Sequence, residues 1–154
     1  MHLSAQIKII DERLKNGMFS MPSYGTPHSA GLDLRAMIDN PLHLAPNEVS
    51  LVPSGVAVYI GAPGYVGLLF PRSGAGHKKG LVLGNLTGVI DADYQGPLMI
   101  SLWNRSPVPL VVEPGDLVAQ LVVCPILQLD LNVVENFSED TVRGVGGFGS
   151  TGSR

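Results

Sequence analysis

The sequence predicts a single all-β domain of the sandwich, jelly-roll or barrel kind. The chain has 154 residues, the usual length of one domain. Its 19 glycines and 12 prolines interrupt helices, and short apolar runs alternate with turn signals, as in proteins built from many short strands. An apolar content of 45% with a net charge of −3 excludes a disordered chain and disfavours a basic nucleic-acid-binding protein.

Seven runs carry the strand signal, and turns rich in glycine and proline separate them. Residues 61–64 separate the first two runs, and residues 114–116 precede the last. Residues 91–97 are expected to form a hairpin turn. At most one short helical turn is expected, near residues 73–78, because no window has a 3.6-residue apolar period. The expected strands cover residues 56–60, 65–70, 81–83, 86–90, 98–103, 108–113 and 117–131.

A change in composition divides the chain into two parts. We expect one β domain over residues 1–137 and a flexible glycine-rich arm over residues 138–154, where apolar side chains nearly vanish. One interpretation is an unstructured tail, which composition alone favours. The other is an arm that closes over a ligand, because glycine N–H groups can approach phosphates and Arg143 can neutralise one. The arm is not a Walker A loop, since no Gly-Lys-Ser/Thr follows.

Charged residues are so sparse in the middle of the chain that each one is a candidate for a specific structural or functional role. Burying a charge alone is costly. Arg72 stands out because Ser73 and Gly74 follow it, and a guanidinium fork, a hydroxyl and an unobstructed N–H together suit an anion. An arginine whose stem packs on the surface is the alternative, and spacing does not separate the two. Residues 49–112 contain six charged side chains, namely Arg72, Lys78, Lys79, Asp91, Asp93 and Arg105.

A pair of aspartates offers a second chemical signal. Asp91 and Asp93 are two residues apart, so in an extended chain they share a face. They fit a polar hairpin end, where aspartate is common, or a general base or metal ligand. No second acidic cluster completes a metal cage, and the four histidines have no ligand spacing. A carboxylate that activates water against a substrate carrying its own Mg²⁺ stays open.

The sequence predicts a cytoplasmic protein. Cys124 is the only cysteine, so we expect no disulfide within the chain and a reducing compartment. The first residues lack the pattern of a signal peptide. The longest uncharged run, residues 49–71, contains prolines and glycines that exclude a continuous membrane-spanning helix. Neither a membrane nor a nucleic acid is expected as a partner.

Five short motifs occur in a fixed order along nearly the whole chain. Each alone would be a weak signal, but five in order at the right separations are a strong one. On these motifs the chain resembles the dUTP diphosphatase (dUTPase) family, of the trimeric bacterial type. Only ordinary apolar exchanges, such as Val89, depart from the family's pattern. The motifs are residues 30–36 (AGLDLRA), 71–74 (PRSG), 88–96 (GVIDADYQG), 115–121 (GDLVAQL) and 143–152 (RGVGGFGSTG).

The resemblance implies a fold, an assembly and a reaction. The implied fold is a distorted jelly roll, or β-clip-like barrel, that forms a homotrimer with active sites at the subunit interfaces. The implied reaction is hydrolysis of dUTP to dUMP and diphosphate, which keeps uracil out of DNA and supplies dUMP for thymidylate synthesis. Asp91 is the implied general base for attack of water on the α-phosphorus. The implied cofactor, Mg²⁺, is held by substrate phosphates and water, with no direct protein ligand.

The resemblance also assigns the substrate-binding residues. Arg143 closes on the outer phosphates when the arm orders, and Phe148 stacks over the uracil. Tyr94 lies under the deoxyribose and excludes a 2′-hydroxyl, and Met99 forms a wall of the pocket. Asn85 begins the segment that pairs with the uracil edge. The other implied residues are Arg72, Ser73, Gly74 and Gln120 at the phosphates, Val89 and Ile90 beside Asn85, and Asp33 in a supporting role.

Two other functions compete with this one. A dCTP deaminase-type enzyme shares the implied fold but needs a carboxylate in the strand after the third motif, and residues 97–104 contain none. A non-catalytic trimeric β module, such as a capsid-like or carbohydrate-binding jelly roll, leaves Asp91 and the Arg143 segment unexplained. In a trimer, the charge-poor runs 98–103 and 117–127 are expected to form interfaces that hide the surplus apolar surface.

Overall fold

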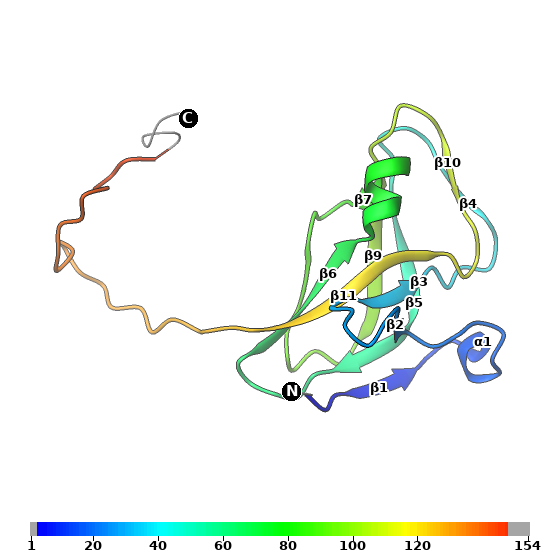
Figure 1. Ribbon diagram of the computed structural model, residues 1–154, viewed down its shortest axis with the longest axis horizontal. Coiled ribbons are helices and arrows are strands. Elements are labelled where there is room, and N and C mark those ends of the chain that lie inside the picture. Colours follow the sequence, from blue (N-terminus) through cyan, green and yellow to red (C-terminus); the bar gives the residue numbers. More distant parts are fainter. Residues whose placement is uncertain (1–2, 148–154) are drawn as a thin grey trace.

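The computed structural model describes residues 3–147 as eleven β-strands and two short helical turns (Figure 1). The predicted all-β class is confirmed. The strands are β1 (Gln6–Ile9), β2 (Ser23–Tyr24), β3 (Leu32–Arg35), β4 (Leu42–Leu44), β5 (Val49–Tyr59), β6 (Tyr65–Pro71), β7 (Leu81–Leu83), β8 (Gly88–Ile90), β9 (Pro97–Asn104), β10 (Leu110–Val112) and β11 (Leu117–Pro125). The helical turns are α1 (Glu12–Lys15) and the π-helical turn η1 (Ala75–Lys79).

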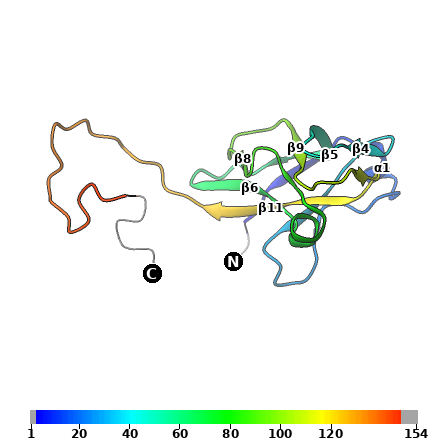
Figure 2. The ribbon, with the colours of Figure 1, turned by 90° about the horizontal axis from the view of Figure 1, so that it is seen from above.

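Two sheets and a two-stranded ribbon make up the fold. The first sheet has the strand order β1-β5-β9-β7, the second has the order β2-β3-β11-β6-β8, and β10 pairs with β4. All of these pairings are antiparallel. Seen from above, the sheets lie as layers, and α1 lies at the end opposite the C-terminal segment (Figure 2). The arrangement is consistent with a distorted jelly roll.

Apolar side chains from both sheets make one buried core. On β9 the alternate residues Leu98, Ile100 and Leu102 are completely buried, as the two-residue period of a strand requires. Leu34 of β3 and Val118 of β11 meet them from the second sheet. Burying one such side chain stabilises the fold by roughly 1.5–3 kcal/mol, so this core fixes how the two sheets sit.

The predicted hairpin around residues 91–97 is wrong. Strand β8 pairs with β6 in the second sheet, whereas β9 pairs with β5 and β7 in the first. The connection therefore carries the chain from one sheet to the other. The Tyr94 amide donates to the Asp91 carbonyl, and the Gly61 amide donates to the Ala92 carbonyl, which together hold this crossing. Local alternation fits a hairpin and two separate sheets equally well, because it does not identify the partner strand.

The N-terminal third contains elements that the sequence pattern did not reveal. Strands β1–β4 and α1 are too short for a clear period, and β5 begins at Val49 instead of residue 56. Pro53 and Gly55 look like strand breakers, but the register with β9 shifts there and Gly55 adopts a φ of 76°. The bulge absorbs both residues within one long strand. The helical turn expected near residues 73–78 is confirmed as η1.

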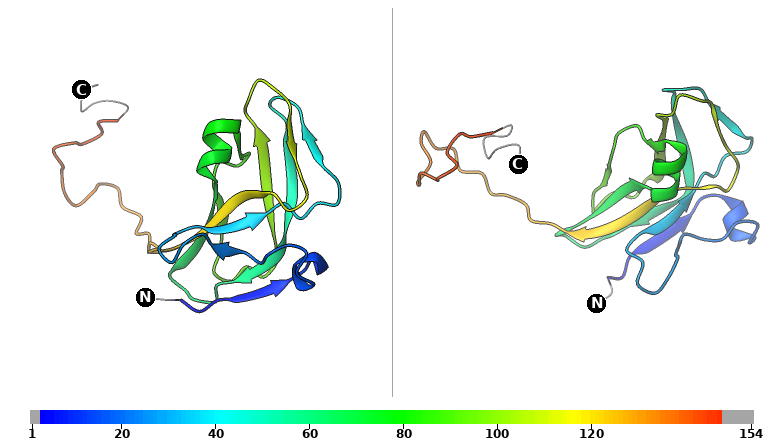
Figure 3. Two further views of the ribbon diagram at one scale, coloured as in Figure 1. Left: turned by 45° about the vertical axis from the view of Figure 1, so that its right-hand side comes forward. Right: turned by 45° about the horizontal axis from the view of Figure 1, so that its top comes forward.

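The last strand is shorter than predicted. β11 ends at Pro125, which pairs with Tyr65, the first residue of β6. Because β6 starts there, β11 has no partner to continue to residue 131. Residues 126–147 then run away from the sheets (Figure 3), and Leu127, Leu129 and Leu131 are 92%, 79% and 83% exposed. The domain boundary after residue 137 stays a prediction.

The uncharged run over residues 49–71 forms β5 and β6 instead of a helix. Pro53 and Gly55 fall at the bulge, residues 61–64 form the turn before Tyr65, and Gly67 and Pro71 lie within β6. In the part of the chain that the structure describes, no helix is long and apolar enough to cross a membrane. The cytoplasmic location stays a prediction.

Candidate active site

An arginine–aspartate ion pair lies at the C-terminal end of β6. Arg72 directly follows this strand, and Asp33 belongs to β3. Arg72 Nε donates to Asp33 Oδ1 at 2.9 Å, and Arg72 Nη2 donates to Asp33 Oδ2 at 3.3 Å. Two parallel bonds of this kind hold the guanidinium plane in one orientation. The Arg72 side chain is 38% exposed, so its other N–H groups are available to an anion.

Strand β11 brings Gln120 beside this pair. Gln120 is in register with Asp33 on one side and with Phe70 of β6 on the other. Its Nε2 donates to the Pro71 carbonyl at 3.0 Å. Side chains from three separate motifs therefore meet because β3, β11 and β6 are neighbours in one sheet.

Ser73 and Gly74 lead from Arg72 into η1, and both are exposed. Gly74 has an ordinary right-handed φ of −67°, and a Cβ added there would meet nothing within 4 Å. Neither backbone strain nor packing requires glycine at this position. The missing side chain leaves the backbone N–H groups open to a ligand. The Gly76 amide donates to the Arg72 carbonyl at 2.9 Å and ties the turn to the ion pair.

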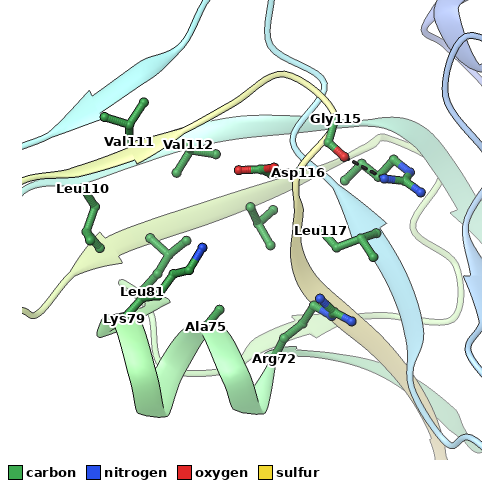
Figure 4. Close-up of a pocket in the computed structure, with 12 residues that line it drawn as sticks. Arg72, Ala75, Lys79, Leu81, Leu110, Val111, Val112, Gly115, Asp116 and Leu117 are labelled. Atoms are coloured by element: carbon green, nitrogen blue, oxygen red, sulfur yellow. Dashed lines mark hydrogen bonds between the residues drawn. The ribbon is translucent and has the colours of Figure 1, made fainter.

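A cavity of about 380 Å³ lies between η1, β10 and the start of β11 (Figure 4). Arg72 and Lys79 line it, and Figure 4 shows Lys79 and Asp116 pointing toward it from opposite walls. Arg35 also lines it, but its Nη1 donates to the Gly115 carbonyl at 2.7 Å, which is a structural role. The sequence did not single out Lys79 for the site, because a lysine pair beside a glycine is typical of any solvated turn.

Asp91 lies near the other end of β6. It follows Ile90 of β8, which pairs with Gly67 near the start of β6. Asp91 and Asp93 are exposed and line an open pocket of about 410 Å³ with Tyr65. Both carboxylates are therefore accessible to water.

The candidate general base and the candidate phosphate site are thus separated within one chain. Ile90 lies opposite Gly67 in the antiparallel β8–β6 register, Arg72 comes five residues after Gly67, and Asp91 is one residue beyond Ile90. At a strand rise of about 3.3 Å per residue, the separation is on the order of 20 Å. One chain does not gather the two groups at one reacting phosphorus.

The segment that begins at Asn85 projects from the edge of the second sheet. Leu86 adopts a φ of 63°, and the Thr87 amide donates to the Asn85 carbonyl at 2.7 Å. A non-glycine residue in this conformation is uncommon and is often found at functional sites. Val89 is 64% exposed, and Ile90 continues the same strand toward Asp91. Asn85, Val89, Ile90 and Asp91 therefore follow one edge.

The remaining predicted residues lie elsewhere in the fold. The Tyr94 hydroxyl donates to the Pro97 carbonyl at 3.0 Å, within the crossing to the first sheet. Met99 is on β9, faces outward and is 38% exposed, so it is not brought to the edge that carries Val89. Arg143 is exposed in the C-terminal segment, where its Nε donates to the Gly146 carbonyl at 3.0 Å. Phe148 lies outside the described residues.

The side chains of residues 3–147 form no dedicated metal cage. Within that range, no three His, Cys, Asp or Glu side chains gather closely enough to hold a metal ion. Asp33, the acidic residue of the candidate phosphate site, hydrogen-bonds Arg72.

Comparisons with known proteins give the family. A model of the family described as dUTPase matches residues 18–152. Curated proteins named deoxyuridine 5′-triphosphate nucleotidohydrolase, from Polynucleobacter asymbioticus and Coxiella burnetii, are 56% and 55% identical over 149 residues, with 97% of each chain covered. The solved dUTPase of Staphylococcus bacteriophage 80alpha with dUpNHpp is 31% identical and covers 97% of this chain and 98% of its own, with a TM-score of 0.84. The chain belongs to the dUTPase family.

Proposed function

We propose that the protein hydrolyses dUTP to dUMP and diphosphate. The observation that carries this proposal is the arrangement of Arg72, its partner Asp33, Gln120 and the open Ser73–Gly74 backbone, in a chain of the dUTPase family. Curated relatives at about 55% identity carry the name deoxyuridine 5′-triphosphate nucleotidohydrolase. By hydrolysing dUTP, the protein would keep uracil out of DNA and supply dUMP for thymidylate synthesis.

The phosphate chain binds at the C-terminal end of β6. Arg72 contributes the charged fork, Ser73 a hydroxyl and Gly74 a backbone N–H, while Gln120 contributes an amide N–H. Asp33 orients the guanidinium through its two hydrogen bonds. Donors fixed before the substrate arrives stabilise the negative charge that develops during phosphoryl transfer without having to reorganise.

Asp91 is the general base. Its exposed carboxylate accepts a proton from a water molecule as the water oxygen attacks the α-phosphorus in line. The bond from the α-phosphorus to the bridging oxygen breaks, and diphosphate leaves with that electron pair. The substrate would be the Mg–dUTP complex, in which Mg²⁺ would neutralise phosphate charge.

The active enzyme is a homotrimer with active sites at the subunit interfaces. Because Asp91 and Arg72 are separated by about the length of β6, a second chain is needed to bring both groups to one substrate. Exposed apolar residues supply interface surface. They include Val49 and Leu51 of β5, Met99 of β9, Val123 of β11 and Leu127, Leu129 and Leu131 beyond it.

Uracil is recognised by the edge that begins at Asn85. An amide and the neighbouring backbone can donate to O4 and accept from N3–H, whereas cytosine presents a donor where uracil has an acceptor. Val89 and Ile90 form the backbone that excludes a thymine methyl, and Tyr94 excludes a 2′-hydroxyl. Because Met99 lies on the other sheet, it can line this pocket only from a neighbouring subunit, across an interface.

The C-terminal arm closes the site. Arg143 moves from its exposed position onto the outer phosphates, and Phe148 covers the uracil ring. Closure excludes water other than the nucleophile and adds a cation to the triphosphate. The side chains of residues 126–145 are exposed, so this segment makes few contacts with its own domain and is free to gain them at the closed active site.

Diphosphate release tests the proposal. The full chain is incubated with Mg²⁺ and dUTP, dCTP, dTTP or UTP, and the product of each reaction is identified. We expect turnover of dUTP and a loss on the order of 100-fold or more for the other nucleotides, because unpaired polar groups and steric overlap oppose them. Conversion of dCTP to dUTP would instead support the deaminase, and binding without turnover would support the non-catalytic module.

A further inference from the structure

Gly31 lies directly against the side chain of Gln120. A Cβ added at Gly31 would overlap Gln120 Oε1 and come within 2.9 Å of Cδ and 3.1 Å of Cβ. Gly31 has no positive φ, so its backbone conformation suits any residue. Glycine is therefore needed at this position for space: Gln120 occupies the volume that a side chain would fill.

This contact sets which end of the Gln120 amide faces the phosphate site. Nε2 donates to the Pro71 carbonyl at 3.0 Å, and a carbonyl only accepts, so the nitrogen end faces Pro71 and Oε1 faces Gly31. Pro71 immediately precedes Arg72. The nitrogen end of the amide therefore lies next to the backbone that leads into Arg72, and its second N–H is not used by this hydrogen bond.

We propose that Gly31 is a positioning residue for triphosphate binding, acting through Gln120. The inference rests on the proposed function, because Gln120 is taken to bind a substrate phosphate. A methyl group at position 31 displaces the flexible end of the glutamine, since the overlapping atom is side-chain Oε1 and not backbone. The substitution therefore leaves the strands in place and removes one donor.

Comparing the affinities for two ligands distinguishes this positioning role from a purely structural one. In the full-length Gly31→Ala variant, affinity for the non-hydrolysable imido analogue of dUTP should fall about 10- to 100-fold, the value of one hydrogen bond to a charged group. Affinity for deoxyuridine, which has no phosphate, should change less than twofold. Equal losses for both ligands, or no loss for the analogue, would overturn the proposal. Gly25→Ala is the matched control, because its Cβ makes only a 3.7 Å contact with Ser29, and it should bind both ligands like the wild type.

A double variant tests the route through Gln120. In the Gln120→Ala background, Gly31→Ala should weaken analogue binding no further, because the displaced amide is already absent. An additional tenfold loss would overturn the proposal. The double variant also relieves the Oε1 overlap, so it gives a decisive result even if Gly31→Ala alone unfolds. Wild-type protein that does not bind the analogue would contradict the proposed function, whereas wild-type binding with an unaffected Gly31→Ala would contradict this inference alone.

Discussion

Arg72 and Asp91 lie at opposite ends of strand β6, on the order of 20 Å apart by the rise of an extended chain. A general base and an arginine that act on one triphosphate must each come within hydrogen-bond reach of it. The proposed reaction therefore requires more than one copy of the chain. We predict a particle of three times the 16.3 kDa chain mass in size-exclusion chromatography with light scattering. A fully active monomer would refute the shared site.

Replacing Asp91 by asparagine should separate binding from chemistry. The amide keeps the shape of the side chain but does not take a proton, so kcat should fall by roughly 10²–10⁴ while the analogue still binds. Stopped assays for diphosphate and titration calorimetry measure the two quantities. Asp93→Asn is the control on the same exposed turn. A fully active Asp91→Asn variant would remove Asp91 from the role of base.

Asp33→Asn should weaken phosphate binding without unfolding the protein. The variant loses the charge that orients Arg72 through bonds of 2.9 and 3.3 Å. We expect kcat/KM for dUTP to fall about tenfold, the lower range for a charge-assisted hydrogen bond. Asp39→Asn is a suitable control, because that carboxylate is 90% exposed and pairs with Arg13 of α1 instead of with Arg72. Equal kinetics for both variants would show that the Asp33–Arg72 pair does not prepare the site.

Truncation after Asp140 should abolish activity and spare the fold. The last strand ends at Pro125, and residues 141–145 are exposed, so few packing contacts are lost. We expect a melting temperature within about 2 °C of the full chain and a kcat lower by about 100-fold, because Arg143 no longer reaches the substrate. Thermal unfolding and diphosphate release check this. An intact kcat would identify the segment as a tail without a catalytic role.

The ion pair that caps α1 should make stability depend on pH. The Arg13 side chain donates to Asp11 and holds the pKa of that carboxyl below its ordinary value. A depressed pKa stabilises the fold above the ordinary value of about 4, and this contribution is lost as the pH falls through the folded value. Asp11→Asn should therefore lower the free energy of unfolding at pH 7 and have a shrinking effect below about pH 4.

Denaturant unfolding at pH 7 and at pH 3 measures how much Asp11→Asn lowers the free energy of unfolding at each pH. Glu12→Gln is the control, because it replaces an exposed carboxylate. A constant destabilisation by Asp11→Asn from pH 7 to pH 3 would show that lost packing, and not charge, is responsible.

Local patterns predicted what is encoded locally. Short apolar runs between turn signals identified most strands from residue 56 onward, and the sequence Pro71-Arg72-Ser73-Gly74 marked a turn that could bind an anion. The crossing after Asp91 could not be predicted in this way, because the local apolar pattern does not identify which sheet a strand joins. Long-range contacts could not be predicted from the sequence either, because nothing in the first motif indicates that Gly31 makes room for Gln120.

Co-expression of two inactive variants tests the shared active site most directly. If Asp91 and Arg72 act on one substrate from different chains, mixed trimers of Asp91→Asn and Arg72→Ala contain some sites with both native residues. Random assortment makes these about a quarter of all sites. The account predicts dUTP turnover near that fraction of the wild-type rate, with each variant alone almost inactive. A mixture no more active than the separate variants would contradict it.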